Sequence, residues 1–124
     1  MFLDFLKKFF GPFLPKTVDK TKVKRQWQKI EELMKLGGES NFEKAVILAD
    51  KLVNWVMQEK GARGNTFAER ARSFRQKFSD CNGLWQAHIL RNHIVHDPDF
   101  ETYKFSAEKA IANFKKALRD LGGL

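Results

Sequence analysis

Apolar residues recur every three or four positions along most of the chain, which is the spacing of one face of an α-helix. The first stripe stops at Gly37-Gly38 and consists of Val23, Trp27, Ile30 and Met34. The second ends at Lys60-Gly61 and consists of Phe42, Val46, Ala49, Val53 and Val56. No stretch of useful length alternates apolar and polar residues as a β-strand would. The pattern therefore predicts helices.

Three more helices are expected toward the C-terminus. One carries the stripe Phe67, Ala71, Phe74 and Phe78. The next runs from about Leu84 to the residues before Pro98, because a residue that precedes proline resists the α conformation. The last carries Ala107, Ala110, Ile111, Phe114, Leu118 and Leu121. Since short loops make consecutive helices antiparallel, the sequence predicts an all-α, up-and-down bundle of four to five helices.

Polar residues mark where three of these helices begin. Ser40 with Glu43, and Thr66 with Glu69, have the spacing of a capping box, in which the two side chains satisfy free backbone N–H groups of the first turn. Ser106 is the expected cap of the last helix.

The first sixteen residues differ from the rest of the chain. They are rich in phenylalanine but are interrupted by Asp4, Lys7, Lys8 and Pro12, so they do not provide the roughly twenty apolar residues of a membrane span. They also lack the basic start and cleavage site of a secretory signal. We expect a segment 1–16 that packs on the bundle or docks a protein partner, in preference to lying on a membrane surface. Residues 17–124 form the bundle.

Composition agrees with one globular domain. A chain of 124 residues with 43% hydrophobic and 31% charged residues is long enough for a single bundle-sized core. The one cysteine, Cys81, cannot form an internal disulfide, which favours a reducing, cytoplasmic setting. The net charge is +8, and the first 35 residues have nine Lys and Arg against four Asp and Glu. This excess favours nucleic acid or an anionic surface as partner, or is a solvated helix face.

Three histidines, His88, His93 and His96, fall within nine residues near the end of the fourth expected helix. We expect His88 and His93 to be ordinary surface or interface residues. His96 has a structural alternative, because a protonated imidazole near a helix C-terminus is stabilised by the helix dipole. The spacings of these histidines and Cys81 do not suit a zinc site, so no metal or other cofactor is expected.

Arg91 and His96 are the residues with a chemical argument. A guanidinium beside an imidazole can hold a phosphate while the imidazole moves a proton. Five residues of separation place the two side chains about 140° apart on an ideal helix. They meet within one chain only if the helix end is loosened, which Asp97-Pro98 would provide.

The stretch Arg91-Asn92-x-x-x-His96 resembles the R-x4–6-H signature of HEPN domains, which are small helical bundles. The order of expected helices from about Thr17 to Leu121 is also similar to that of HEPN domains, particularly of small bacterial members. The resemblance implies a metal-independent RNase, of the toxin or defence type, whose site forms at a homodimer interface. It implies that the ribose 2′-hydroxyl attacks the adjacent phosphate. His96 would then be the general acid or base, Arg91 would stabilise the developing charge, and Asn92 would position the phosphate or the histidine.

The chain also departs from the pattern of these toxins. Some carry a tyrosine two residues after the histidine, which an antitoxin modifies, and here that position is Pro98. Asp97 and Asp99 next to His96 would oppose RNA binding close by. Many HEPN-like domains are inactive, so a non-catalytic adaptor that binds a partner protein or nucleic acid through its N-terminal segment is the alternative function.

Asp50 and His93 are the expected supporting residues of the site. Asp50 lies amid apolar residues of the second helix, and a carboxylate buried there needs a partner. Arg91 is the attractive partner, and the alternative is that Asp50 faces solvent between Ile47 and Asn54. Core packing, rather than base stacking, is the expected role of the aromatic residues on the apolar stripes, namely Trp27, Trp55, Phe67, Phe74 and Phe114.

Overall fold

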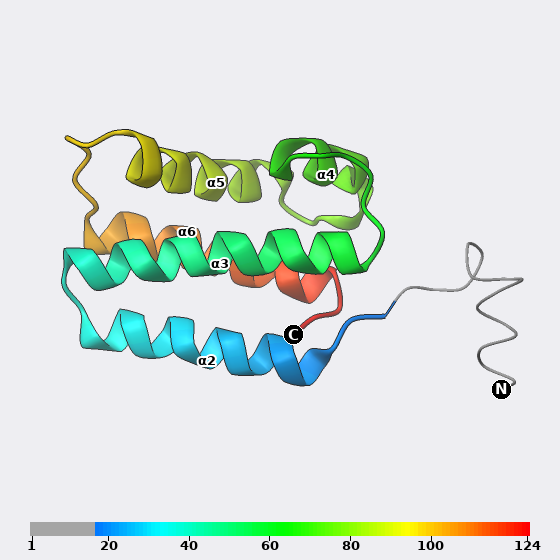
Figure 1. Cartoon of the computed structure of the whole chain (residues 1–124), viewed down its shortest axis with the longest axis horizontal. Coiled ribbons are helices and arrows are strands. Elements are labelled where there is room, and N and C mark those ends of the chain that lie inside the picture. The colour runs from blue at the N-terminus through cyan, green and yellow to red at the C-terminus, as the bar shows by residue number, and fades with distance from the viewer. Residues whose placement is uncertain (1–16) are drawn as a thin grey trace, which may run out of the picture.

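The computed structural model describes residues 17–124, so the expectations for segment 1–16 lie outside the described residues. The chain forms α2 (Lys20–Leu36), α3 (Glu39–Glu59), α4 (Phe67–Ser73), α5 (Cys81–His96) and α6 (Lys104–Asp120), with one 3-10 turn at Arg75–Lys77 (Figure 1). There is no strand among residues 17–124. The predicted all-α bundle is confirmed, and no helix in this range is long and apolar enough to cross a membrane.

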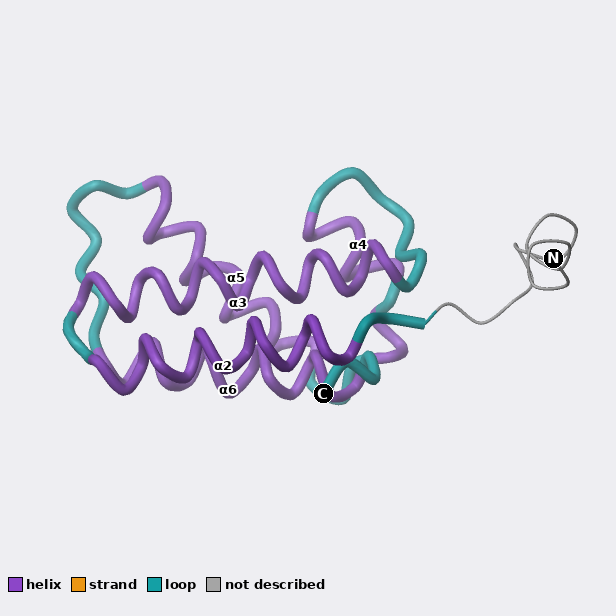
Figure 2. The backbone as a smooth tube through the Cα atoms, turned by 60° about the horizontal axis from the view of Figure 1, so that its bottom comes forward, coloured by secondary structure: helices purple, strands orange, loops and turns teal. Residues whose placement is uncertain are grey.

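Helix α3 is the centre of the bundle. It packs against α2 on one side and α5 on the other, and it also contacts α6 and the short α4. The long helices run side by side with their loops at the two ends of the bundle, as both views of the backbone show (Figure 2). Consecutive long helices alternate in direction, so α3 and α5 are antiparallel.

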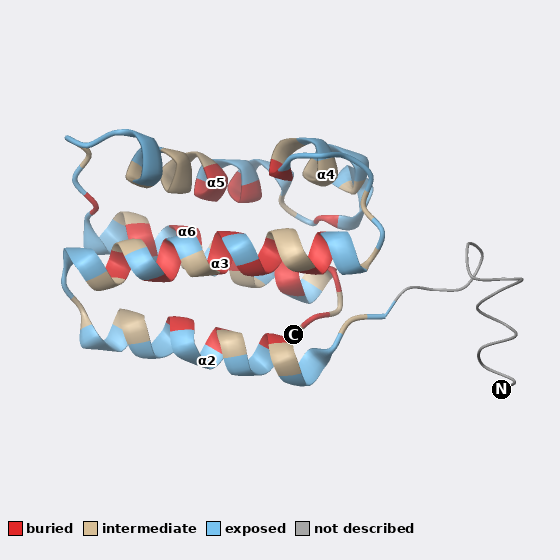
Figure 3. Cartoon of the chain, viewed as in Figure 1, coloured by how far each residue is buried: buried red, intermediate tan, exposed pale blue. Residues whose placement is uncertain are grey.

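Burial follows the predicted stripes (Figure 3). The stripe of α3 is buried throughout, because this helix has neighbours on several sides. The stripes of α2 and α6 are also buried, except that Met34 and Ile111 are half-buried at the margin of the core. Periodicity alone therefore identified most of the core.

Helix starts were predicted less well than helix faces. Thr66 caps α4, since its Oγ1 accepts from the backbone N–H of Glu69 at 3.1 Å. The Glu69 carboxylate bonds the N–H of Asn65 instead of that of Thr66, so the capping box is displaced by one residue. Asp80, which the prediction did not include, accepts from the N–H of Gly83 at 2.8 Å and starts α5 three residues earlier than expected.

Ser40 and Ser106 are not caps, and both predictions were wrong. Gly37 and Gly38 have φ angles of 73° and 90°, and this tight turn lets α3 begin immediately at Glu39, with Ser40 already inside the helix. Ser106 lies inside α6, which begins at Lys104. The N–H of Thr102 bonds the Glu39 carboxylate at 2.9 Å, which ties the start of α6 to the start of α3.

Helices α5 and α6 approach each other closely at Gly83. A Cβ at this buried position would overlap the Asp80 carboxylate and the side-chain oxygen of Asn113 on α6. A larger residue would therefore force the capping side chain of Asp80 or the side chain of Asn113 to move.

We predict that Gly83→Ala lowers the free energy of unfolding by about 1–3 kcal/mol, because the added methyl overpacks this contact. The loss should occur although alanine favours a helix by about 1 kcal/mol over glycine. Urea denaturation monitored by circular dichroism measures it. The control is Asn82→Ala at the exposed neighbouring position, which should change stability by less than about 0.5 kcal/mol. A Gly83→Ala protein as stable as the parent would contradict the steric argument.

Candidate functional site

The buried carboxylate of Asp50 connects the central helix α3 to α5. Its side chain is 6% exposed, and its Oδ2 lies 2.6 Å from Nδ1 of His88. A carboxylate can only accept, so the His88 Nδ1 carries the proton and donates it. The other oxygen, Oδ1, lies 3.7 Å from Nε of Arg91. One carboxylate thus holds two basic side chains of α5.

The helix geometry explains why these three residues meet. His88 and Arg91 are three residues apart, so they lie on the same side of α5, one above the other. Asp50 lies on α3, which packs against that side of α5. The expected contact between Asp50 and Arg91 is present, and the alternative of a solvent-facing Asp50 is wrong. The shorter bond to His88 was not predicted.

His88 is buried, with 7% of its surface exposed, so of the two expected places, at the surface or in an interface, the surface is excluded. The ring of Phe67 on α4 stacks on the imidazole, with a centroid distance of 4.0 Å and an interplanar angle of 4°. Trp85 lies against the imidazole at 5.7 Å in a tilted arrangement. The short helix α4 therefore covers His88, and stacking together with the bond to Asp50 fixes the plane of the ring. No periodicity along the sequence reveals where such a short helix will lie.

The guanidinium of Arg91 is held on one side and open on the other. Its Nη1 donates to the side-chain oxygen of Asn92 at 3.0 Å. Its Nε is buried and has no hydrogen-bond partner among residues 17–124, so Asp50 attracts it by charge across 3.7 Å without a hydrogen bond. The Arg91 side chain is 32% exposed. Because a guanidinium has five N–H donors, it keeps donors for a ligand.

His96 lies apart from Arg91. It is the last residue of α5 and is exposed, and the N–H of Asp97 bonds the carbonyl of His93 at 2.9 Å. The helix is regular through His96, so the expected loosening that would bring it to Arg91 does not occur. The two side chains are separated by about 7.5 Å along the axis and about 140° around it. Within one chain they do not form a pair.

His93 does not join this group either. Its ring stacks on Phe100 at 5.0 Å, and it lines an open cavity of about 610 Å³ between α5 and α6. Neither Arg91 nor His96 lines that cavity. No three His, Cys, Asp or Glu side chains of residues 17–124 come together as metal ligands would.

A second polar residue, Asn54, lies on α3 one turn beyond Asp50. Asn54 accepts from Nη1 of Arg70 on α4 at 2.9 Å, which places another guanidinium on this face of the bundle. Neither Arg70 nor Phe67 was predicted to belong to the site. The signal in the sequence is the pair Asp50 and Asn54, two polar residues one helical turn apart and therefore on the same side of the helix.

We predict that Asp50→Ala lowers the free energy of unfolding by about 3–5 kcal/mol, because it leaves the Arg91 guanidinium without its buried counter-charge and the buried His88 imidazole without its hydrogen-bond partner. Urea denaturation measures the loss. Combined with His88→Ala in a double-mutant cycle, the two changes should couple by about 0.5–3 kcal/mol.

Lys51→Ala is the matched control, because this neighbouring residue of α3 is exposed and charged. It should be nearly neutral. Equal effects of Asp50→Ala and Lys51→Ala, or strict additivity with His88→Ala, would contradict the role given to the Asp50 carboxylate.

Comparison of the chain with known protein families, with curated proteins and with solved structures finds no match. The likeness to HEPN domains therefore rests on the Arg91-Asn92-x-x-x-His96 motif and on its position at the end of the penultimate helix of an all-α bundle.

Proposed function

We propose that the chain is a metal-independent endoribonuclease that acts as a homodimer, with Arg91 of one copy and His96 of the other at the same phosphate. The observation that carries the proposal is the state of Arg91. The guanidinium is oriented from behind by Asp50 and from the side by Asn92, and about a third of the side chain is exposed. Such a fixed, partly open guanidinium suits a phosphate, which it can bind through two parallel N–H donors.

The reaction needs one group to move a proton and one to stabilise charge. The 2′-oxygen forms a bond to phosphorus, the bond from phosphorus to the 5′-oxygen breaks, and the products are a 2′,3′-cyclic phosphate and a 5′-hydroxyl. His96 takes the proton from the 2′-hydroxyl or gives one to the leaving 5′-oxygen. Arg91 stabilises the negative charge that grows on the phosphoryl oxygens.

The separation of Arg91 and His96 within one chain supports a dimer. A second copy can bring its His96 to the Arg91 that its own chain does not reach. Two exposed apolar side chains are available near Asp50 and Arg91: Ile47 on α3 is 36% exposed and Val95 on α5 is 45% exposed. Because α3 and α5 are antiparallel, Ile47 and Val95 both lie about one turn beyond the contact between Asp50 and Arg91, on the side of His96. These side chains offer apolar surface for a second copy.

A non-catalytic adaptor is the second candidate. The observation that favours it is the contact of Arg91 with the buried Asp50, which is also what a purely structural ion pair would look like. The two candidates differ in the outcome of a cleavage assay.

For the nuclease, we predict that the purified protein cleaves single-stranded RNA in the presence of EDTA. His96→Ala should lower the rate by about 10²–10⁴-fold, the usual contribution of a positioned proton-transfer group. Arg91→Ala should also lower it strongly, and gel analysis of end-labelled RNA measures both. Gln86→Ala, at an exposed position of the same helix, is the control and should cleave like the parent. Cleavage by His96→Ala at the parent rate would exclude the proposal, and absence of cleavage by the parent would favour the adaptor.

Pairing across the dimer has its own test. A mixture of the two inactive proteins, Arg91→Ala and His96→Ala, should regain activity after the subunits exchange. In a mixed dimer one of the two sites contains both Arg91 and His96, so about a quarter of the parent activity is expected at equal amounts. No recovery, despite exchange shown by differently tagged subunits, would contradict a site shared between chains.

A further inference from the structure

A second pocket lies between α4 and the start of α5. It has a volume of about 220 Å³, its walls include Phe67, Phe78 and Trp85, and Arg72 and Arg75 also line it. The ring of Phe67 is shared, because it lines this pocket and also stacks on His88. The pocket therefore borders the imidazole that bonds Asp50.

Trp85 is the exposed aromatic residue of this pocket. It is 43% exposed, whereas Phe67 and Phe78 are each 8% exposed. It lies on α5 six residues before Arg91, which corresponds to about 9 Å along the helix axis. The two side chains are also about 120° apart around the helix, so the guanidinium groups beside the indole are those of Arg72 and Arg75, which line the same pocket. A solvent-accessible indole beside guanidinium groups is the combination on which single-stranded nucleic acids stack and bind.

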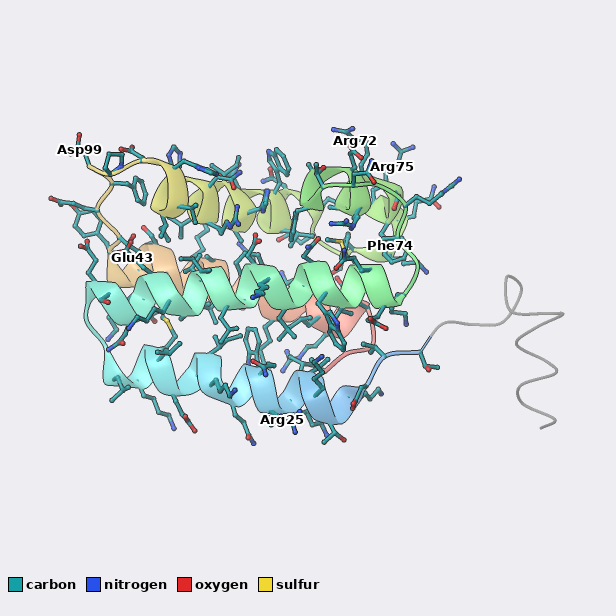
Figure 4. All side chains as sticks on the ribbon, viewed as in Figure 1. Arg25, Glu43, Arg72, Phe74, Arg75 and Asp99 are labelled. Atoms are coloured by element: carbon teal, nitrogen blue, oxygen red, sulfur yellow. The ribbon has the colours of Figure 1, made fainter. Side chains whose placement is uncertain are left out.

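The rim of the pocket is strongly basic. Residues 63–77 contain five Lys and Arg against one Glu, a local charge of +4. Arg72 and Arg75 are exposed, and neither forms an ion pair with another residue of the range 17–124. Arg72 on α4 and Arg75 in the 3-10 turn that follows lie at the edge of the bundle opposite to Arg25 on α2 (Figure 4). This rim offers two free guanidinium groups to an anionic ligand.

We infer that this pocket is the base-binding subsite for a single-stranded RNA. One unstacked base lies against Trp85, the phosphates next to it bind Arg72 and Arg75, and the strand continues along α5 to Arg91. The inference rests on the proposed function for the nature of the ligand. It adds the place where a base binds and a reason for the preference for single strands, because a base held in a duplex is already stacked and paired and would have to leave the helix to enter the pocket.

The combination of groups favours nucleic acid over an acidic peptide. Arginines alone would suit either ligand, but a peptide carboxylate has no planar ring for the indole. Stacking on an indole is available to every base, so we expect little preference for sequence at this subsite.

The first test measures binding without reaction. Full-length protein is titrated into a fluorescent, short, single-stranded oligonucleotide whose 2′-hydroxyls are methylated, so that no nucleophile is present. Trp85→Leu should weaken binding by about 5- to 150-fold, the equivalent of one lost base–aromatic stack, and Trp85→Phe should restore most of it. The control is Trp55→Leu, a half-buried indole on α3 that contacts the ammonium group of Lys22 and does not line the pocket. Equal affinities of Trp85→Leu and Trp55→Leu would overturn the inference.

The second test measures the salt dependence of the same binding. Removing two phosphate contacts by Arg72→Ser with Arg75→Ser should reduce the slope of log K against log salt by about 1.4, at roughly 0.7 for each contact on a single strand. Arg25→Ser with Lys29→Ser removes the same charge from exposed positions of α2 and should leave the slope nearly unchanged. Equal reductions by the two double variants would show a diffuse electrostatic effect and would overturn the subsite. Circular dichroism establishes that all variants are folded.

Two ligand comparisons complete the test. Double-stranded RNA should bind more weakly than the single strand and should be insensitive to Trp85→Leu. Tighter binding of the duplex, or displacement of the oligonucleotide by polyglutamate with the same dependence on Trp85, would overturn a base-binding role.

Failure of this inference is distinguishable from failure of the nuclease proposal. A parent that cleaves no RNA but binds the methylated strand through Trp85 retains the subsite and loses the catalytic function. A parent that cleaves RNA with a KM unaffected by Trp85→Leu retains the function and loses the subsite.

Discussion

The packing of α3, α4 and α5 against one another depends on the contacts of the buried Asp50 carboxylate. An unpaired charge on the central helix would be strongly destabilising, and α5 supplies its partners in His88 and Arg91. Because these two residues are one turn apart, satisfying Asp50 also fixes which side of α5 turns toward α3. Helix α4 then covers the imidazole with Phe67. The positions of α3, α4 and α5 are thus coupled through one acidic side chain.

Because of this coupling, His88 and His96 have different roles. His88 is held by a 2.6 Å bond and a parallel ring, so its contribution is to keep α5 and Arg91 in place. His96 is exposed at the end of the same helix and is available for a proton transfer. The proposed nuclease needs a second chain because the regular helix keeps His96 away from Arg91 of its own chain.

The short helix α4 connects the candidate site with a basic, aromatic surface. Through Phe67 it contacts His88, and Arg72 on α4 and Arg75 just after it line the same pocket as Trp85. A strand of RNA bound along this surface would pass from the basic rim of the pocket to the guanidinium of Arg91. Binding and chemistry would then use neighbouring stretches of α4 and α5.

The sequence by itself predicted the long helices and most of the core and singled out Asp50 and Arg91, because helical periodicity, glycine stops and the need to pair a buried charge are evident from neighbouring positions. It extended the third expected helix to Phe78, whereas α4 ends at Ser73. It did not determine the starts of α3 and α6, where a glycine turn and a contact between Thr102 and Glu39 replaced the expected serine caps. Nor did it place His88 beside Asp50, keep His96 apart from Arg91, or leave Trp85 exposed next to α4. Only the tertiary structure decided these points, because they depend on how helices distant in sequence pack against one another.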